Sequence, residues 1–257
     1  MNSQIFGFLT VLLLISIIPM VDAQISIGEK AIQKSVEINI DSDGNVHVKH
    51  VIRSSNLPKD LELVYGTVSN ISVKNEQGED VLFSSSNENS MVLVQPSDEE
   101  SIVEYDLEHV LIQKDNVWTW NFLYLETTSF FFPEELNLIF SNERPVYLDG
   151  KKGIACHGCQ MLLEYSMNQP KIVKNVNWED NEFIVEIQSH SSIDKFTFDQ
   201  PTKSITFDVL KENQFVTVII PLELLWKPYS VFLDDEKIFF HEYINNGTHV
   251  LLSMKPE

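Results

Sequence analysis

Short runs in which apolar and polar residues alternate are the feature that most constrains this chain. The segment SVEINI at 35–40 places Val or Ile at every second position, and such residues share one face of a strand. DSDGN at 41–45 follows, and Asp-Gly favours a tight hairpin turn. Alternation then resumes in VHVKHVIR at 46–53. Together these three segments predict a β-hairpin.

The same rhythm continues along the chain, with polar turn sequences every eight to fifteen residues, which is typical of antiparallel sandwiches or barrels. A second set of strands begins after SMNQPK at 166–171. We therefore predict an all-β protein with two antiparallel, immunoglobulin-like β-sandwich domains, at 24–165 and 166–257. Pro suits the first position of a helix, so one short helix per domain is possible at PEEL (133–136) and PLELL (221–225).

The N-terminus predicts export. Residues 5–21 are largely apolar and VDA at 21–23 offers the small residues that a signal peptidase prefers. We interpret 1–23 as a signal peptide. An uncleaved anchor is the alternative, because 17 apolar residues are at the lower limit for crossing a bilayer, and this segment would then be the protein's membrane contact. In either case residues 24–257 are extracellular or at the cell surface.

The charge of the chain limits its partners. The formal net charge is −20, and loss of Asp22 with the signal peptide changes it to −19. A chain this acidic is repelled by phosphate backbones and anionic lipids. We therefore expect no nucleic-acid partner, and we interpret the charge chiefly as a device for solubility.

GIACHGCQ at 153–160 is the sharpest motif, and it holds the two cysteines of the chain. In an oxidising compartment Cys156 and Cys159 are expected to form a disulfide across a very small loop, with Gly153 and Gly158 permitting a tight backbone. Two alternatives stay open. Cys156, His157 and Cys159 are three candidate ligands for copper or zinc, and a C-x-x-C pair also suits thiol redox chemistry.

Other candidate positions are less specific. Trp118, Trp120, Phe122 and Tyr124 share one strand face, which is either a core face or a platform for sugar stacking. His47 and His50 are three apart and so are predicted on opposite strand faces. Asn70 in NIS and Asn246 in NGT are acceptor sequences for N-glycosylation. We find no G-x-S-x-G, no H-E-x-x-H and no Gly-rich phosphate loop.

A further set of strand patterns carries a resemblance. These patterns are SSIDKFTFDQPTKSITFDVL, VTVIIPLELL, VFLDDEKIFFHEY and THVLLSM. Over roughly residues 183–254 the chain resembles a module of secreted surface proteins of ammonia-oxidising archaea. The resemblance implies a β-sandwich at a cell surface with no assigned catalysis. Those proteins often continue into a C-terminal membrane sorting tail, whereas this sequence stops at MKPE, so we expect release or an N-terminal anchor.

These observations predict a secreted or cell-surface protein that binds or has a structural role at the cell envelope. The expected partners are envelope or extracellular proteins or glycans. We predict no catalysis and no cofactor. The alternative, from a different functional class, is an extracellular copper-binding or thiol-redox carrier that uses the CHGC motif at 156–159.

Overall fold

The computed structural model describes residues 28–86, 90–148, 153–245 and 247–256. Across these ranges the chain forms strands joined by turns and irregular segments, so the predicted all-β class is confirmed. The proposed signal peptide at 1–23 and the acceptor Asn246 lie outside the described residues. A search of the described ranges for a helix long and apolar enough to cross a membrane finds none.

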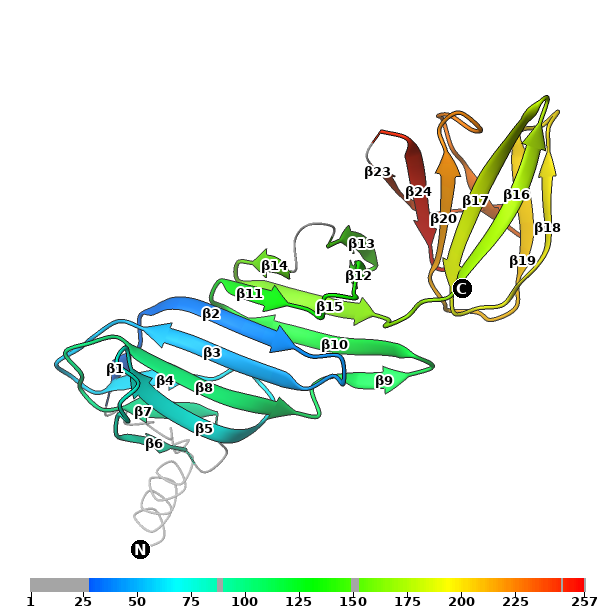
Figure 1. Cartoon of the computed structure of the whole chain (residues 1–257). Coiled ribbons are helices and arrows are strands. Elements are labelled where there is room, and N and C mark those ends of the chain that lie inside the picture. The colour runs from blue at the N-terminus through cyan, green and yellow to red at the C-terminus, as the bar shows by residue number, and fades with distance from the viewer. Residues whose placement is uncertain (1–27, 87–89, 149–152, 246, 257) are drawn as a thin grey trace, which may run out of the picture.

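The first group of strands forms three sheets (Figure 1). The six-stranded sheet contains β2 (Gln33–Ile40), β3 (Val46–Ile52), β5 (Thr67–Asn75), β8 (Ser101–Glu108), β11 (Thr128–Phe131) and β14 (Gly153–Cys156), in the order β14-β11-β2-β3-β8-β5. The five-stranded sheet contains β9 (Ile112–Lys114), β10 (Val117–Tyr124), β12 (Leu138–Ser141), β13 (Arg144–Tyr147) and β15 (Cys159–Tyr165), in the order β13-β12-β15-β10-β9. The four-stranded sheet contains β1 (Glu29–Lys30), β4 (Lys59–Glu62), β6 (Phe83–Ser85) and β7 (Met91–Val94), in the order β1-β4-β7-β6.

One continuous core lies among these three sheets. The predicted hairpin is β2–β3, in which Ile38 pairs with Val48 and neither side chain has exposed surface. Alternate positions of the strands therefore face inward, as the period of two predicts. This N-terminal core draws on all three sheets, with Ile38, Val48 and Tyr105 from the six-stranded sheet, Leu61 and Val92 from the four-stranded sheet, and Phe122 and Leu163 from the five-stranded sheet.

The second group also has three sheets. The largest contains β16 (Lys171–Trp178), β17 (Asn181–Ser189), β20 (Val216–Pro221), β23 (His241–Asn245) and β24 (His249–Met254), in the order β16-β17-β20-β24-β23. Two hairpins accompany it, β18 (Ile193–Asp199) with β19 (Ser204–Val209) and β21 (Val231–Leu233) with β22 (Glu236–Ile238). The C-terminal core between them includes Val185, Ile187, Val218, Leu224 and Val250.

Figure 1 shows the two groups side by side, joined by one connection of the chain. Each of the sheets among the described strands takes all its members either from β1–β15 or from β16–β24. The chain passes from one group to the other between Tyr165 and Lys171.

Two expectations need correction. The sheets are mainly antiparallel, but β1 pairs with β4 and β2 pairs with β11 in parallel. Long connections separate these partners, so no tight hairpin dictates their direction.

The segments PEEL and PLELL are turns and not helices. The Leu136 N–H donates to the Pro133 carbonyl at 3.1 Å, and the Leu224 N–H donates to the Pro221 carbonyl at 3.0 Å. Starting a helix is unfavourable, because the first turn fixes several dihedral angles for only one or two hydrogen bonds. After PEEL the strand β12 begins, and after PLELL a bend follows, so neither turn extends into a helix.

Candidate functional site

The CHGC motif forms the predicted disulfide. Cys156 and Cys159 are bonded, with their Cα atoms 5.7 Å apart. Gly158, in the turn between them, has a φ of 54°, and a Cβ there would lie 3.3 Å from the Leu125 carbonyl oxygen. At Gly153 a Cβ would lie 2.2 Å from the Phe130 carbonyl oxygen. Both glycines are therefore required by the backbone around the motif.

The disulfide stands where the chain crosses between two sheets. Cys156 ends β14 and pairs with Thr128 of β11 in the six-stranded sheet. Cys159 begins β15 and pairs with Tyr124 of β10 in the five-stranded sheet. The short segment from β10 to β11 crosses between the same two sheets beside it. The disulfide therefore closes the β14–β15 crossing at one corner of the N-terminal group, with the β10–β11 crossing beside it.

His157 is exposed at this corner and its Nδ1 lies in a hydrogen bond with the Thr127 hydroxyl. The metal alternative would require free thiolates, and in this structure both sulfurs are bonded to each other. Among the described residues, no group of three or more His, Cys, Asp or Glu side chains is placed to hold a metal ion. The arrangement favours the disulfide interpretation of the motif.

The histidines of β3 lie on opposite faces, as predicted. His47 is exposed and its Nδ1 lies 2.8 Å from Asp106 Oδ1. Asn70, the described glycosylation candidate, is exposed at a bulge in β5 and donates from Nδ2 to Asp106 Oδ2 at 2.8 Å. The bonds from Asn70 and His47 lower the pKa of the Asp106 carboxyl. A glycan on Asn70 would have to share this amide nitrogen with Asp106.

Sequence reasoning missed the environment of His50, which has no exposed surface. Its Nδ1 lies 2.7 Å from Gln33 Oε1, and its Nε2 lies 2.9 Å from the Tyr105 hydroxyl. The Tyr105 oxygen also accepts from the Val64 N–H at 2.8 Å. A neutral imidazole that donates from Nδ1 and accepts at Nε2 satisfies all of these groups. Burial lowers the pKa of His50 to about 3.

The same network continues to the other two sheets. Gln33 Nε2 donates to the Tyr124 hydroxyl at 2.9 Å, and that hydroxyl donates to the Glu62 carbonyl at 2.6 Å. Glu62 ends β4 of the four-stranded sheet, while Tyr124 ends β10 of the five-stranded sheet. A chain of hydrogen bonds through the core thus links all three sheets. The alternation of residues in β3 places His50 on the same inward face as Val46 and Val48. This alternation was the signal available in the sequence.

The aromatic strand β10 is a core strand and not a sugar platform. Trp120, Phe122 and Tyr124 are 4%, 1% and 6% exposed. Trp118 is partly buried and lies over the β2–β3 turn, where a Cβ at Gly44 would come within 2.5 Å of its ring. Packing on the core side therefore uses the whole aromatic face of the strand.

The two groups of strands meet at a joint. The rings of Phe140 and Phe215 stack with centroids 3.6 Å apart, and those of Tyr147 and Tyr243 stack at 4.6 Å. Burial raises the pKa of the Tyr147 hydroxyl to about 12, and the nearby hydroxyls of Ser253 and Thr217 act in the opposite direction. The outer face of β12–β13 therefore packs against the outer face of β20, β23 and β24.

A buried carboxylate also lies in the joint. Glu164 Oε1 is 3.6 Å from Lys255 Nζ, and the side chains are 11% and 21% exposed. Lys255 Nζ in turn lies 5.0 Å from the centroid of the Phe215 ring. The ion pair and the aromatic stack are thus neighbours, and both join residues from the two groups of strands.

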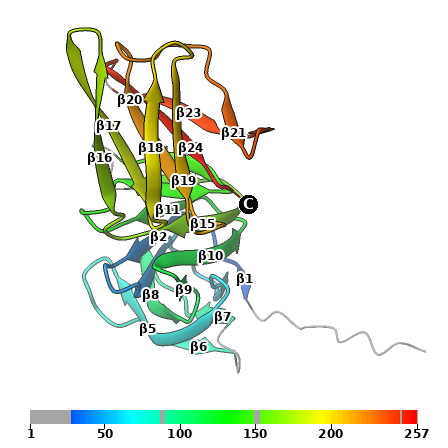
Figure 2. The same cartoon turned by 90° about the vertical axis from the view of Figure 1, so that its right-hand side faces the viewer.

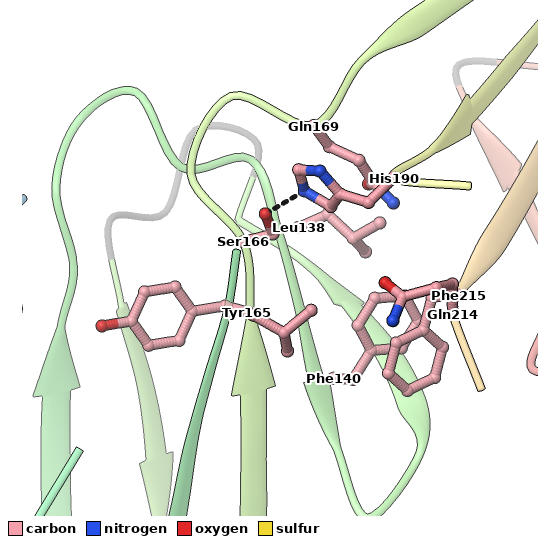
Figure 3. A pocket seen from close by; sticks show the side chains of 9 residues that line it. Leu138, Phe140, Tyr165, Ser166, Gln169, His190, Gln214 and Phe215 are labelled. Atoms are coloured by element: carbon pink, nitrogen blue, oxygen red, sulfur yellow. Dashed lines mark hydrogen bonds between the residues drawn. The ribbon is translucent and has the colours of Figure 1, made fainter. Parts of the chain in front are cut away.

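A small cavity of about 20 Å³ lies beside this stack (Figure 3). Its lining includes Ser166 and His190, whose Oγ and Nε2 form a hydrogen bond across the connection between the groups. Burial, followed by the charge of Lys211, lowers the pKa of His190. The Ser166 hydroxyl donates to the Asn116 carbonyl at 2.8 Å, so its oxygen accepts from His190 Nε2. The cavity has room for about one water molecule, far less than a small-molecule site needs. Ser166 and His190 therefore have a structural role in the joint between the two groups of strands.

Comparisons with known proteins give little. No family model matches the chain, and no curated protein matches it. Among solved structures, the chain is similar to an aminopeptidase N family protein from Idiomarina loihiensis, with a TM-score of 0.38 and 7% identity. The match covers 58% of this chain and 32% of that protein.

Proposed function

We propose that this protein is secreted or held at the cell surface and works there by binding or structural association at the envelope. The observation that carries the proposal is a concentration of exposed aromatic side chains in the second group of strands. Trp226, Phe232 and Phe239 are 56%, 61% and 77% exposed. They lie within fourteen residues of sequence.

Such side chains have a physical cost that binding can offset. Each exposes apolar area to water, and burying it in a complex contributes about 25 cal/mol per Å² before the costs of association. Aromatic residues are also the ones that dominate interface energies. The exposed aromatics of the first group are more dispersed, between Tyr65 and Phe131. We therefore assign the binding surface to the second group.

The Cys156–Cys159 disulfide supports the proposal that the protein lies outside the cytoplasm. A Cys156–Cys159 disulfide persists in oxidising environments such as the extracellular space. The export signal predicted at 1–23 and the resemblance to archaeal surface proteins agree with this assignment.

The test is secretion followed by retention. The full chain is expressed in a host with an export pathway, and we expect it outside the cell, with residues 1–23 removed, as measured by intact mass. Purified protein is then mixed with insoluble envelope preparations and sedimented. Trp226→Ala, and the double variant Phe232→Ala with Phe239→Ala, should each be compared with Ile112→Ala, an exposed aliphatic control in the first group.

Loss of retention in at least one aromatic variant, with the control unchanged, supports the proposal. Cytoplasmic accumulation of the chain overturns it, as does the absence of retention in the wild-type protein or retention that every variant preserves.

A further inference from the structure

Three connections meet at the end of the second group that lies away from the joint. β16 ends at Trp178, the turn between β18 and β19 ends at Lys203, and the segment after β20 contains Trp226. Val216, at the start of β20, follows the joint residue Phe215, so β20 runs away from the joint toward this end (Figures 1 and 2). Connections clustered at one end of a sandwich are a common place for binding residues.

The two indoles and the ammonium form a compact cluster. The ring centroids of Trp178 and Trp226 are 6.1 Å apart, with 22° between the planes. Lys203 Nζ lies 3.8 Å from the Trp226 centroid and 5.5 Å from that of Trp178. The ammonium lies over the Trp226 ring, and the three separations form a triangle and not a line, so it does not lie between the two rings.

The cluster has one anchored side and one open side. Trp178 is partly buried against the C-terminal core and lies 5.8 Å from the Phe198 ring. Trp226 keeps 56% of its surface exposed even with the ammonium beside it. The aromatic surface is therefore held in place by the core while remaining accessible to solvent.

Lys203 is a hydrogen-bond donor near this open surface. Its ammonium lies over the rings, and Asp199 on the same turn uses its carboxylate to accept from the Thr202 N–H at 3.2 Å and from the Thr202 hydroxyl. Lys203 is exposed, so N–H groups that face away from the rings remain available. An ammonium has three donors and no acceptor, which matches ligands rich in hydroxyl oxygens.

We propose that Trp178, Lys203 and Trp226 form a binding site for a neutral carbohydrate. The apolar C–H face of a pyranose packs on the exposed indole, because the negative face of the aromatic quadrupole attracts weakly positive hydrogens. Lys203 donates hydrogen bonds to sugar hydroxyls. The formal charge of −20 disfavours polyanionic glycans. This inference rests on the proposed envelope-binding function and names its ligand class.

The test uses the full secreted chain and neutral hexasaccharides of glucose, mannose and N-acetylglucosamine, with an oligogalacturonate as the acidic probe. Binding is measured by titration calorimetry and by tryptophan fluorescence. We expect at least one neutral probe to bind. Trp226→Ala should weaken its binding at least about tenfold, and Lys203→Met should weaken it about threefold. Tyr65→Ala, on an exposed aromatic of the first group, and Lys237→Met, on an exposed lysine of the second group, are the controls, and we expect changes below about twofold. Neutral binding should also change little between low and high salt.

Several results would overturn the inference. They are binding that all variants retain, binding of no neutral probe, and tighter, salt-sensitive binding of the acidic probe. Envelope retention that depends on Phe232 and Phe239, with no carbohydrate binding, leaves the proposed function in place and removes this site from it. Circular dichroism confirms that each variant is folded.

Discussion

The two groups of strands close their cores in different ways. The N-terminal core contains a hydrogen-bond chain from Tyr105 through His50 and Gln33 to Tyr124, and a disulfide holds one of its corners. The C-terminal core is a cluster of aliphatic and aromatic residues, and exposed aromatics lie on its outside. Specific polar contacts therefore align the sheets of the first group, while the second group exposes the aromatic side chains on which the proposed binding function rests.

The polar chain specifies how three sheets meet. An apolar contact tolerates sliding and repacking, but each buried donor needs its own acceptor at the correct distance. A shift of one sheet would leave a donor or acceptor in this chain unpaired. The C-terminal core lies among one five-stranded sheet and two two-stranded hairpins, so two of its three surfaces are small.

The largest expected effect tests whether the cores are independent. Phe130 has no exposed surface and lies 4.8 Å from the Phe122 ring. Phe130→Ala should lower the free energy of unfolding of the N-terminal core by about 3–5 kcal/mol. Calorimetry should then show one transition shifted and another nearly in place. Leu224→Ala, in the C-terminal core, is the reciprocal control. A joint shift of all transitions by either variant would contradict two independent cores.

The second prediction concerns acid stability of the N-terminal core. His50 has a pKa of about 3 when folded and about 6.5 in the unfolded chain. Between these values the unfolded state binds more protons, so stability rises with pH. The contribution of His50 to the free energy of unfolding is fully present above about pH 6.5. It falls by up to about 4 kcal/mol as the pH approaches 3. His50→Gln should be less stable at pH 7 but should lose this part of the pH dependence.

Chemical denaturation at a series of pH values measures that slope. His109→Asn is a suitable control, because His109 is exposed and has a φ of 59°, which asparagine tolerates. An unchanged acid slope in His50→Gln would show that other groups cause the acid sensitivity.

The third prediction concerns the corner disulfide. The loop that it closes is very short, so loss of the bond should cost about 2 kcal/mol on chain-entropy grounds. The double variant Cys156→Ser with Cys159→Ser should lower the stability of the N-terminal core by this amount and leave the C-terminal core unchanged. Chemical reduction of the wild-type protein should give the same shift.

Metal analysis and thiol titration of the protein as purified test the competing carrier interpretation. Thiol titration of the untreated chain should find no free thiol. Stoichiometric copper or zinc in the protein as purified would favour Cys156, His157 and Cys159 as ligands over a structural disulfide.

Much of the fold was predictable because local periodicity encodes which residues face inward. The β2–β3 hairpin and the buried face of β10 follow from alternation and from an Asp-Gly turn. The parallel pairing of β2 with β11 did not follow, since no local pattern states which distant strands are neighbours. For the same reason the bond between Gln33 and Tyr124, 91 residues apart in sequence, was out of reach.

The candidate sites show the same limit. Cys156 and Cys159 are close in sequence, so their pairing was predictable, but the crossing of two sheets at that corner was not. Trp178, Lys203 and Trp226 come from three separate segments of the chain, the end of β16, the β18–β19 turn and the segment after β20. Sequence reasoning directed the sugar hypothesis to the buried strand β10 instead. Exposure decides between a core aromatic and a binding aromatic, and exposure depends on the tertiary arrangement.

The smallest expected effect concerns two hydroxyl groups that are buried in the second group of strands. Thr217 and Ser253 pair across β20 and β24, their hydroxyls are 2.8 Å apart, and both residues are buried on the face that meets the joint. Thr217→Val alone leaves the serine without this partner and should cost about 1 kcal/mol or more. Adding Ser253→Ala removes both polar groups, so the double variant should recover to within about 1 kcal/mol of the wild-type protein. Denaturant unfolding of the two single variants and the double variant measures the difference. A double variant less stable than either single would mean that these hydroxyls serve the joint in the way that the His50 chain serves the N-terminal core.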